Sequence, residues 1–433
     1  MKILRTTDRN FRYDFGKVYH RNVEVPESVQ KSVAAILDDL KRIGDEALFK
    51  HTEKFDHYSV NIKTVEVPSK EMSLAARKLD AKDLQALKTA AKRIEEFAGH
   101  HLEKSWEYAK DDVSLGLHFS PLERIGIYVP GGKAAYPSTV LMTAIPARVA
   151  GVKEIIMCSP RPGGEVNDAV LAAAKIAGVG RIFKVGGAQA IGAMAYGTKT
   201  IPRVDKIVGP GNIYVTWAKK MVFGQVDIDM IAGPTEICIL ADGSVPAEFM
   251  AADLLAQAEH DEMACPLLIT DNSNYASRVE GEVRRQLIRI ERKAIASESI
   301  QKRALIVLVR NLQEGVDLVN EVAPEHLELA LKEARSYVPK IRHAGAIFVG
   351  ENTPETIGDY IAGPSHVLPT IGTARYYSVL TASDFIKATS VISFGRKALG
   401  KLGPPAARLA RLEGLSAHAH AVEVRLKKAN HRA

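Results

Sequence analysis

The sequence predicts an α/β fold with two doubly wound parallel sheets. Between residues 124 and 212, runs rich in β-branched residues mostly end in glycine, and a helical segment of small residues follows each run. After residue 229 the same alternation resumes without a long linker. Repeated alternation of strands and helices is typical of parallel sheets that carry helices on both faces. We therefore expect two α/β domains packed face to face around a cleft, with small extensions at both ends of the chain.

The composition is that of a globular protein with full hydrophobic cores. The 433 residues are 46% hydrophobic and 25% charged. No stretch is apolar over the length needed to cross a bilayer, and residues 1–9 hold no export signal, so we expect a cytoplasmic protein that does not bind membranes. Cys158, Cys238 and Cys265 are an odd, scattered set, which argues against disulfides.

The net charge of +7 does not by itself indicate nucleic-acid binding. Basic residues alternate with acidic ones along the chain, and only the tail 425–432 is a basic run. No recognition helix, aromatic RNA-binding motif or zinc-finger spacing accompanies that tail, so no nucleic-acid partner is expected. A modest positive field would also suit an anionic cofactor.

The first half of the chain predicts helices followed by glycine-ended strands. Residues 1–24 show no clear period, whereas residues 28–52 and 69–106 have the apolar spacing of helices. The strands are expected within residues 125–132, 154–160, 181–187 and 206–212. Glycine at the carboxyl end of a parallel strand lets main-chain N–H groups approach a phosphate or dinucleotide. No Gly-x-Gly-x-x-Gly or Gly-Lys-Ser/Thr motif is present, so tight strand-to-helix packing stays open as the alternative.

The second half predicts another set of strands and helices. Strands are expected at residues 235–240, 266–270, 304–309 and 345–349, and helices at 246–259 and 273–290. Residues 312–322 have helical spacing and residues 327–331 alternate as in a strand, so Glu325 and His326 should lie on the turn between them. Pro324 could instead open a helix, but the alternation favours a strand. After about residue 380 we expect helices, broken by Gly-Pro-Pro at 403–405.

Further polar residues have the types and spacing of ligands. Gln257 and His260 share one face at the end of a predicted helix and could contact one ion, although a helix-end cap is the commoner role. Asp359 and His366 follow the last strand in a loop rich in Gly and Pro, where they could also serve a turn. His418 lies on the apolar stripe of the tail helix, a position typical of core or interface histidines.

These segments, in this order, resemble the histidinol dehydrogenase family over nearly the whole chain. Thr235 stands where serine is common in that family, which preserves the hydroxyl group. The resemblance rests on eight short motifs: Tyr128-Val129-Pro130-Gly131-Gly132, Val185-Gly186-Gly187-Ala188-Gln189-Ala190, Gly209-Pro210-Gly211-Asn212, Ala232-Gly233-Pro234-Thr235-Glu236, Gln257-Ala258-Glu259-His260, Pro324-Glu325-His326, Gly363-Pro364-Ser365-His366-Val367-Leu368-Pro369 and Glu413-Gly414-Leu415-Ser416-Ala417-His418.

The resemblance implies roles for individual residues. Glu325 and His326 would be catalytic. The implied zinc ligands are Gln257, His260, Asp359 and His418. The implied substrate contacts are Thr235, Gln257, His260, His326, Asp359, His366, Glu413 and His418. The implied NAD contacts are Tyr128, Gln189 and Asn212. The C-terminal unit would reach the site of a second subunit, so that Glu413 and His418 act across a homodimer.

The resemblance also implies the domains and the reaction. The fold would be incomplete Rossmann-like and similar to that of aldehyde dehydrogenases. Residues 124–234 would bind NAD, residues 25–106 with 235–380 would hold zinc and substrate, residues 1–24 with 107–123 would form a small connecting element, and residues 381–433 a dimer-contact domain. L-histidinol would be oxidised through L-histidinaldehyde to L-histidine with one zinc ion per subunit and two NAD, the last steps of histidine biosynthesis.

The residue chemistry suggests how such a reaction would proceed. His326 would be the base in both oxidations, because its ordinary pKa lies near neutrality, and Glu325 would activate water in the second. A zinc-dependent dehydrogenase of another polar alcohol and a non-catalytic nucleotide-binding protein stay open as alternatives. We expect no role for Cys265 as a nucleophile, although it closely follows His260.

Overall fold

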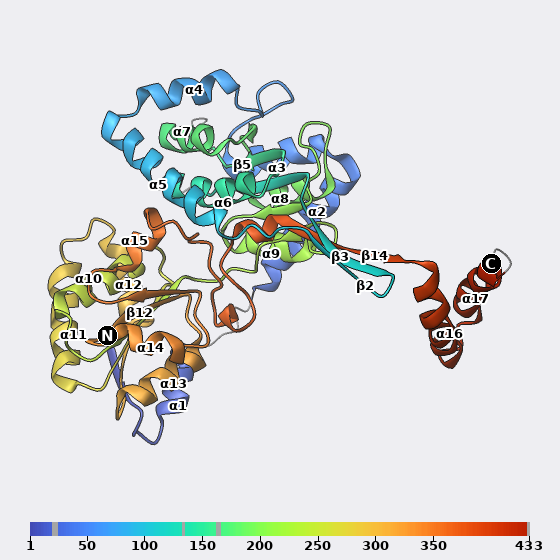
Figure 1. Cartoon of the computed structure of the whole chain (residues 1–433). Coiled ribbons are helices and arrows are strands. Elements are labelled where there is room, and N and C mark those ends of the chain that lie inside the picture. Colours follow the sequence, from blue (N-terminus) through green and yellow to red (C-terminus); the bar gives the residue numbers. More distant parts are fainter. Residues whose placement is uncertain (20–24, 132–134, 162–165, 431–433) are drawn as a thin grey trace. The chain divides into compact units, whose positions relative to one another are not determined.

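A computed structural model describes residues 1–19, 25–131, 135–161 and 166–430 (Figure 1). The chain divides into two compact units, Met1–His101 with Leu122–Phe385, and Leu102–Pro121 with Ile386–Ala433. Gly132 of the predicted glycine-ended run 125–132 and residues 431–432 of the basic tail lie outside the described residues. Within the described ranges, every helix is too short or too polar to cross a membrane.

The first unit contains a six-stranded parallel sheet in the order β1-β11-β10-β9-β12-β13. Its strands are β1 (Lys2–Arg5), β9 (Glu236–Ala241), β10 (Cys265–Thr270), β11 (Leu305–Leu308), β12 (His326–Ala330) and β13 (Ala346–Val349). Successive residues of β9 pack into hydrophobic cores on opposite faces of the sheet. Ile237 and Ile239 pack on one face, and Cys238 and Leu240 on the other. A strand buried on both faces belongs to a doubly wound sheet.

Helices cover both faces of this sheet (Figure 1). On one side lie α10 (Ala247–Ala258), α11 (Ser273–Leu287) and α12 (Lys293–Lys302). On the other side lie α1 (Phe11–Val18), α13 (Leu312–Val322) and α14 (Ala334–Tyr337). The short helices α15 (Glu355–Tyr360), η2 (Val338–Lys340), η3 (Thr373–Arg375) and η4 (Ala382–Phe385) belong to the connecting segments.

A second parallel sheet of the same unit has the order β6-β5-β4-β7-β8. Its strands are β4 (Arg124–Tyr128), β5 (Glu154–Cys158), β6 (Arg181–Phe183), β7 (Lys206–Val208) and β8 (Asp227–Ile228). One core contains α4 (Ser69–Lys78), α5 (Ala81–Gly99), α6 (Pro137–Val149) and α7 (Asp168–Ala177), and the other α2 (Glu27–Ile43), α3 (Asp45–Asp56), α8 (Gly187–Tyr196) and α9 (Ile213–Val222). The predicted fold class of two doubly wound parallel sheets is confirmed.

The early helices differ from the sequence expectation in two ways. Residues 28–52 form two helices because Gly44 adopts a φ of 51° between α2 and α3. Residues 69–106 also divide, since the Asp80 side chain caps α5 by accepting from Lys82 N over 2.7 Å. Moreover, helices α2 to α5 pack on the five-stranded sheet, whereas the sequence-based division groups residues 25–106 with residues 235–380.

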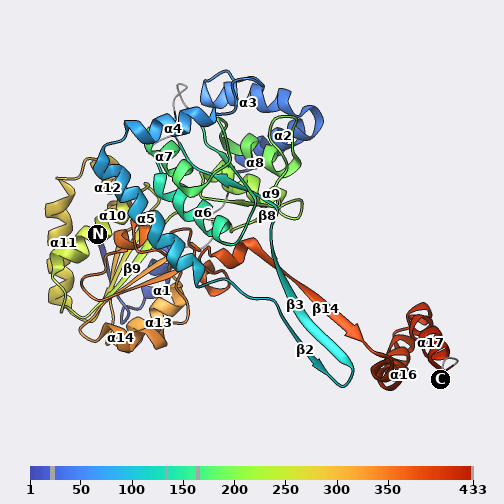
Figure 2. The same ribbon diagram turned by 45° about the horizontal axis from the view of Figure 1, so that its top comes forward.

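The second unit combines an antiparallel sheet with two helices (Figure 2). β3 (Val113–Pro121) lies between β2 (Trp106–Lys110) and β14 (Ile386–Phe394). The helices are α16 (Arg396–Leu412) and α17 (Ser416–Asn430). The prediction of helix from residue 380 onward was therefore wrong for residues 386–394, because β14 satisfies its main-chain groups by pairing with β3.

The Gly-Pro-Pro segment lies within a helix and does not break it. α16 continues through Pro404 and Pro405, so the predicted break was wrong. Proline removes main-chain donors from a helix, and such a helix needs support from its packing. That support comes from α17: a Cβ atom on Gly403 would lie only 3.1 Å from Val422 and 3.2 Å from Leu426. The close approach of these small and apolar residues holds the two helices together.

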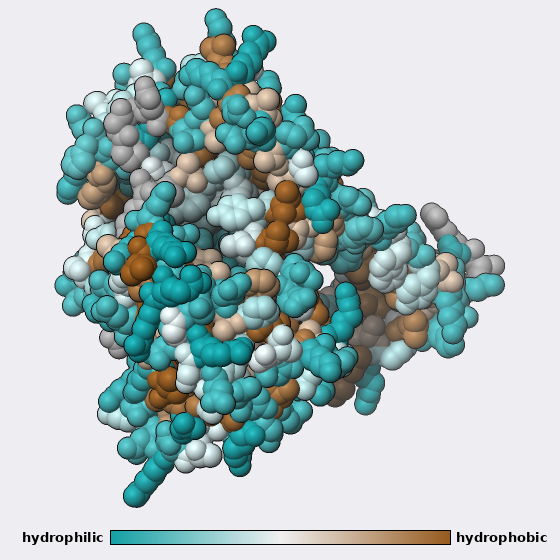
Figure 3. All heavy atoms as spheres, turned by 90° about the vertical axis from the view of Figure 1, so that its left-hand side faces the viewer, coloured by the Kyte–Doolittle hydropathy of each residue, from teal (hydrophilic) through white to brown (hydrophobic). Residues whose placement is uncertain are grey.

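One face of the molecule is mainly hydrophilic (Figure 3). The hydrophobic residues visible there lie in small separate groups among hydrophilic ones. Scattered apolar residues of this kind are normal on a protein surface.

Candidate active site

A cavity of about 770 Å³ is lined by residues from both sheets of the first unit. A pocket of this size accommodates a cofactor or a small substrate with part of a cofactor. The residues of the predicted site that line it are Tyr128, Gln189, Asn212, Thr235, His260, Glu325, His326, Asp359 and His366. The structure thus brings together nine residues that span more than half of the sequence.

The two sheets contribute opposite ends of their strands to this cavity. Tyr128 ends β4, and Gly209 directly follows β7, so the five-stranded sheet presents its carboxyl edge. His326 is the first residue of β12, and Thr235 directly precedes β9, so the six-stranded sheet presents its amino edge. The carboxyl edge is where parallel sheets ordinarily bind nucleotides. The polar residues on the amino edge therefore face that edge across the cavity.

Glu325 is a buried carboxylate held by two donors. The helix α13 ends at Val322, and Ala323 adopts a φ of 49°, which turns the chain toward β12. Glu325 Oε2 accepts from the Thr235 hydroxyl over 2.7 Å and from Glu236 N over 2.9 Å. Burial raises the pKa of Glu325, while His326 and these two donors oppose that rise. Glu325 is thus a carboxylate whose basicity exceeds that of an ordinary surface residue.

His326 lies directly beside Glu325 with one ring nitrogen fixed. Nδ1 donates to the main-chain carbonyl oxygen of Glu236 over 3.0 Å. Nε2 lies 3.6 Å from Asp359 Oδ1 and 3.9 Å from Glu355 Oε1. Burial by itself lowers the pKa of His326, but Glu325, Asp359 and Glu355 raise it well above its ordinary value. A cation bound by Asp359 and Glu355 would offset part of the negative charge that causes this rise.

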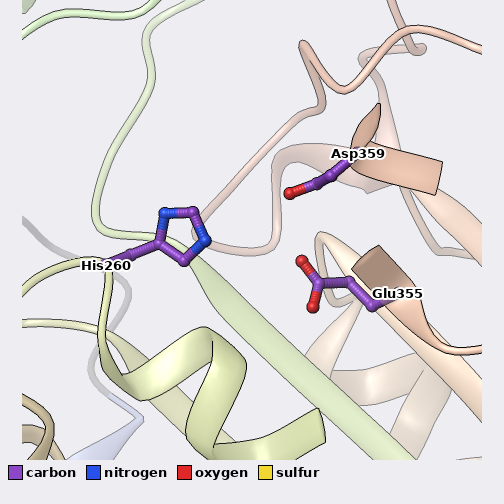
Figure 4. Close-up of side chains that lie close together, drawn as sticks. All are labelled: His260, Glu355 and Asp359. Atoms are coloured by element: carbon purple, nitrogen blue, oxygen red, sulfur yellow. The ribbon is translucent and has the colours of Figure 1, made fainter. Parts of the chain in front are cut away.

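His260, Glu355 and Asp359 converge from two elements (Figure 4). Their ligand atoms all lie within 4.8 Å of one another, near the spread of a coordination sphere with bonds of about 2 Å. Burial lowers the pKa of His260, which favours the neutral ligand form. The pKa of Asp359 falls to about 2 because the effect of His326 outweighs burial. One imidazole and two carboxylates are donors that suit zinc.

Gln257, a predicted zinc ligand, has a buried amide group that contacts Thr235. Its Nε2 donates to Thr235 Oγ1 over 2.6 Å, while its buried Oε1 has no hydrogen-bond partner among the described residues. A buried polar atom without a partner calls for a ligand or a water molecule. His260 lies two residues beyond the end of α10, and the last turn of α10 contains Gln257. The residues present therefore fit a divalent cation.

The sequence reasoning did not find Glu355. Its side chain is only 1% exposed, and neither carboxylate oxygen has a hydrogen-bond partner within the described part of the chain. Burial raises the pKa of Glu355 to about 8. Asp359 lies in the same short helix, α15, and not in a loop as expected. The spacing of four residues between two acidic side chains was the sequence signal, since it places both on one helix face.

His366 links the segment after α15 to the helices of the five-stranded sheet. Nδ1 donates to the main-chain oxygen of Asp359 over 3.0 Å, so Nε2 accepts from the Thr139 hydroxyl over 3.1 Å. Both nitrogens of the neutral ring are thereby used, and burial lowers the pKa of His366. His366 thus lies beside Asp359 in the lining of the cavity, and its contact with substrate stays a prediction.

The three predicted NAD contacts lie at the glycine turns. The Tyr128 hydroxyl accepts from Gly187 N over 3.1 Å, at the start of α8. Gln189 is buried in the first turn of that helix, and its Nε2 has no partner among the residues described. The Asn212 side chain caps α9 by accepting from Tyr214 N and Val215 N. The turns that the sequence indicated for a cofactor thus lie together in the cavity.

Glu413 and His418 belong to the second unit. Glu413 follows the last residue of α16, and His418 lies in the first turn of α17. Both are exposed within that unit, and His418 does not share the packed face of Ala419. Their contribution to the site stays a prediction.

Comparisons with known proteins identify the family. The sequence matches the family described as histidinol dehydrogenase over residues 19–426. It is 51% identical over 428 residues to the histidinol dehydrogenase of Syntrophotalea carbinolica, covering 99% of both chains. It is 48% identical over 429 residues to that of Geobacter metallireducens, covering 99% of this chain and 98% of the relative. The crystal structure of histidinol dehydrogenase from Elizabethkingia anophelis is similar with a TM-score of 0.93, 38% identity and 99% coverage of each chain. The chain therefore belongs to the histidinol dehydrogenase family of oxidoreductases.

Proposed function

We propose that this protein oxidises L-histidinol through L-histidinaldehyde to L-histidine, with zinc and NAD, as the last steps of histidine biosynthesis. The observation that carries the proposal is the arrangement of one cavity. It combines the glycine turns of a nucleotide-binding sheet, a buried Glu325–His326 pair and a group of oxygen and nitrogen ligands. Family membership makes histidinol the expected substrate.

The ligands proposed for zinc are Gln257, His260, Asp359 and His418. Glu355 lies close enough to support the same cation. A zinc ion with mixed nitrogen and oxygen ligands would act as a Lewis acid and hold the amine and imidazole of the substrate. Binding would then hold the alcohol carbon in a reactive position. Such positioning accounts for a large part of the rate enhancement in reactions of this kind.

His326 is proposed as the base of both oxidations. Its Nδ1 donates a hydrogen bond to the Glu236 carbonyl oxygen, so Nε2 is the atom that takes the hydroxyl proton of the alcohol. NAD held at the turns of Tyr128, Gln189 and Asn212 would supply the acceptor for the hydride, and so for the two electrons, of each oxidation. The first oxidation thus breaks one C–H and one O–H bond and leaves the aldehyde.

Glu325 is proposed to activate water in the second oxidation. Water adds to the aldehyde carbon, and Glu325 removes a proton from that water. The hydrated aldehyde would then lose its hydroxyl proton to His326 and a hydride to the second NAD, which leaves the carboxylate. Thr235 and Glu236 N hold one oxygen of Glu325 in place, so its orientation does not depend on the substrate.

We also infer that the active protein is a homodimer in which the C-terminal unit supplies Glu413 and His418 to the other subunit. Exposed apolar side chains on the second unit support an interface. They include Val391, Ile392 and Phe394 on β14 and Leu402, Leu409 and Leu412 on α16.

One assay tests the proposed reaction. The purified protein should contain zinc and release two NADH per histidinol oxidised, and removal of zinc by a chelator should abolish turnover until zinc is restored. Other amino alcohols should react far more slowly. Zinc-free protein with full activity, or equal rates on unrelated amino alcohols, would contradict the proposal.

A complementation experiment tests the shared site. His326→Ala and His418→Ala variants, each inactive alone, should form mixed dimers in which one site is intact. A mixture of equal parts, allowed to exchange subunits, should recover about one quarter of the wild-type activity, because half the dimers are mixed and each has one intact site. No recovery, with subunit exchange shown by mass spectrometry, would place His418 in the site of its own chain or outside any site.

A further inference from the structure

The turn between β7 and α9 is held by a buried ion pair that the proposed reaction does not use. Lys219, on α9, pairs with Asp229, which directly follows β8. The two side chains are 3% and 1% exposed. Lys219 Nζ also donates to the Gly209 carbonyl oxygen over 3.0 Å, and Gly209 N donates to Asp229 Oδ2 over 2.7 Å. Both main-chain polar groups of Gly209 are thus bonded to this pair.

Asp229 is fixed by more than Lys219. Its Oδ1 also accepts from Met230 N over 2.6 Å, so the carboxylate bridges the main chain after β8 and the main chain after β7. A buried carboxylate with several donors and a cation beside it is well compensated for its loss of water. The pair is therefore a fixed connection between two neighbouring strand ends.

The turn held by this pair has little room to move in one direction. Gly209 adopts a φ of 113°, and a Cβ atom there would lie 2.2 Å from the Tyr128 carbonyl oxygen. Asn212 closes the turn by capping α9. The turn thus approaches the Tyr128 backbone closely on one side and is hydrogen-bonded to Lys219 and Asp229 on the other. All of these residues line the cavity.

We propose that Lys219 and Asp229 form a positioning pair that holds the Gly209–Asn212 turn in the shape that binds the dinucleotide. This inference rests on the proposed binding of NAD. A lysine beside a nucleotide cavity invites a different interpretation, that of a direct phosphate ligand. Here the charge of Lys219 is balanced by Asp229, and its Nζ is bonded to Asp229 and Gly209. Lys219 therefore acts on the dinucleotide through the turn.

A double-mutant cycle distinguishes a positioning role of Lys219 from direct binding of a phosphate group. Lys219→Met, Asp229→Asn and the double variant are compared with the wild-type zinc-loaded protein for NAD⁺ binding by calorimetry. Each single change should raise the Kd by about tenfold or more, because small displacements of binding groups are costly. The double variant should be no weaker than the weaker single variant, because both changes remove the same connection. Histidinol affinity and zinc content should stay as in the wild type.

Two results would overturn the positioning role. If Asp229→Asn binds NAD⁺ as tightly as the wild type or more tightly while Lys219→Met binds weakly, Lys219 is a direct phosphate ligand. If both variants have a lower Tm but an unchanged Kd for NAD⁺ well below that temperature, the pair only stabilises the fold. Arg181→Met is a control, since Arg181 forms an ion pair with Glu66 but is the first residue of β6 and so lies at the amino edge of the same sheet, away from the turn. It should lower stability without changing the Kd.

A measurement without NAD⁺ keeps this test independent of the proposed function. Amide hydrogen exchange of residues 209–213 should be faster in both single variants than in the wild type and in Arg181→Met, since the turn loses its anchor. Unchanged exchange would refute the positioning role even if the protein does not bind NAD⁺. Faster exchange with no binding of NAD⁺ by the wild type would instead refute only the proposed cofactor.

Discussion

His326 donates a hydrogen bond of 3.0 Å from Nδ1 to the main-chain carbonyl oxygen of Glu236. A carbonyl oxygen can only accept, so this contact fixes the proton on Nδ1 and turns Nε2 toward Asp359 and Glu355. The contact joins the first residues of the neighbouring strands β9 and β12, in which His326 pairs with Ile237, the residue after Glu236. The orientation of the base is thus set by the sheet itself.

Replacing His326 by Asn should impair both oxidations. Asn can still donate to the Glu236 carbonyl but offers no base at the position of Nε2, so we expect rates about 10²-fold or more below the wild type in each half-reaction. The measurement is steady-state NADH formation from histidinol and, separately, from histidinaldehyde. A normal rate with either substrate would contradict the role of His326 as the shared base.

Removing the Thr235 hydroxyl should shift the pH dependence of aldehyde oxidation. Burial raises the pKa of Glu325, and the hydrogen bond from Thr235 opposes that rise. Without it the pKa rises further, so less Glu325 is ionised at a given pH and the acidic limb of the kcat/KM profile moves to higher pH.

The comparison for that prediction is Thr235→Val against Thr235→Ser. The serine variant keeps the hydroxyl and should retain the wild-type profile. A kcat/KM profile of Thr235→Val that coincides with the wild-type profile would show that the ionisation of Glu325 does not determine the acidic limb.

Cys265→Ser should retain most of the activity. Burial raises the pKa of the Cys265 thiol to about 12, and Sγ donates to the Met263 carbonyl oxygen over 3.3 Å. A thiol that stays protonated at neutral pH is a poor nucleophile. The check is turnover together with zinc content. Abolished turnover in a variant that still binds zinc would mean that the reaction passes through a covalent intermediate on this residue.

Asp253 and Glu328 should make the protein less stable as the pH rises. Burial raises the pKa of Asp253 to about 6 and that of Glu328 well above its ordinary value. Both folded pKa values exceed the unfolded values near 4, so the folded state binds more protons between these limits. The stabilisation is complete below about pH 4 and is lost as the pH passes through the folded pKa values, by about 3 kcal/mol for Asp253.

Urea unfolding of zinc-free protein between pH 5 and 8 measures this effect. The free energy of unfolding should fall across that range in the wild type and fall less in Asp253→Asn. Glu298→Gln is the control, because Glu298 forms an exposed pair with Lys302 and should leave the slope unchanged. Equal slopes for wild type and Asp253→Asn would contradict the assignment.

The sequence was sufficient for the architecture because its signals are local. The alternation of strand and helix patterns from residue 124 onward indicated both parallel sheets, and the change of period around Glu325 and His326 located the end of α13 and the start of β12. Strand β14 was missed because residues 386–394 satisfy their main-chain groups by pairing with β3, which lies about 270 residues earlier in the chain. Such long-range pairing leaves no local periodicity that separates it from a helix.

The site was less accessible to sequence reasoning than the fold. Glu355 was overlooked because its proximity to His260 arises only when α15 and the end of α10 meet in space. Lys219 and Asp229 are ordinary charged residues in the sequence, and only burial on both sides of Gly209 distinguishes them. By contrast, the sequence could predict Gln257 and His260 as a pair because their spacing is a local property, although His260 lies two residues beyond the end of α10.

Comparison of the two half-reactions in Glu325→Gln tests the division of labour between the two neighbouring residues most directly. Glutamine keeps the size of the side chain and can accept the hydrogen bonds from Thr235 and Glu236, but it cannot take a proton from water. We predict that the rate of NADH formation from histidinaldehyde falls about 10²-fold or more, while the rate of histidinol oxidation to the aldehyde falls much less. Equal losses in both half-reactions would contradict it.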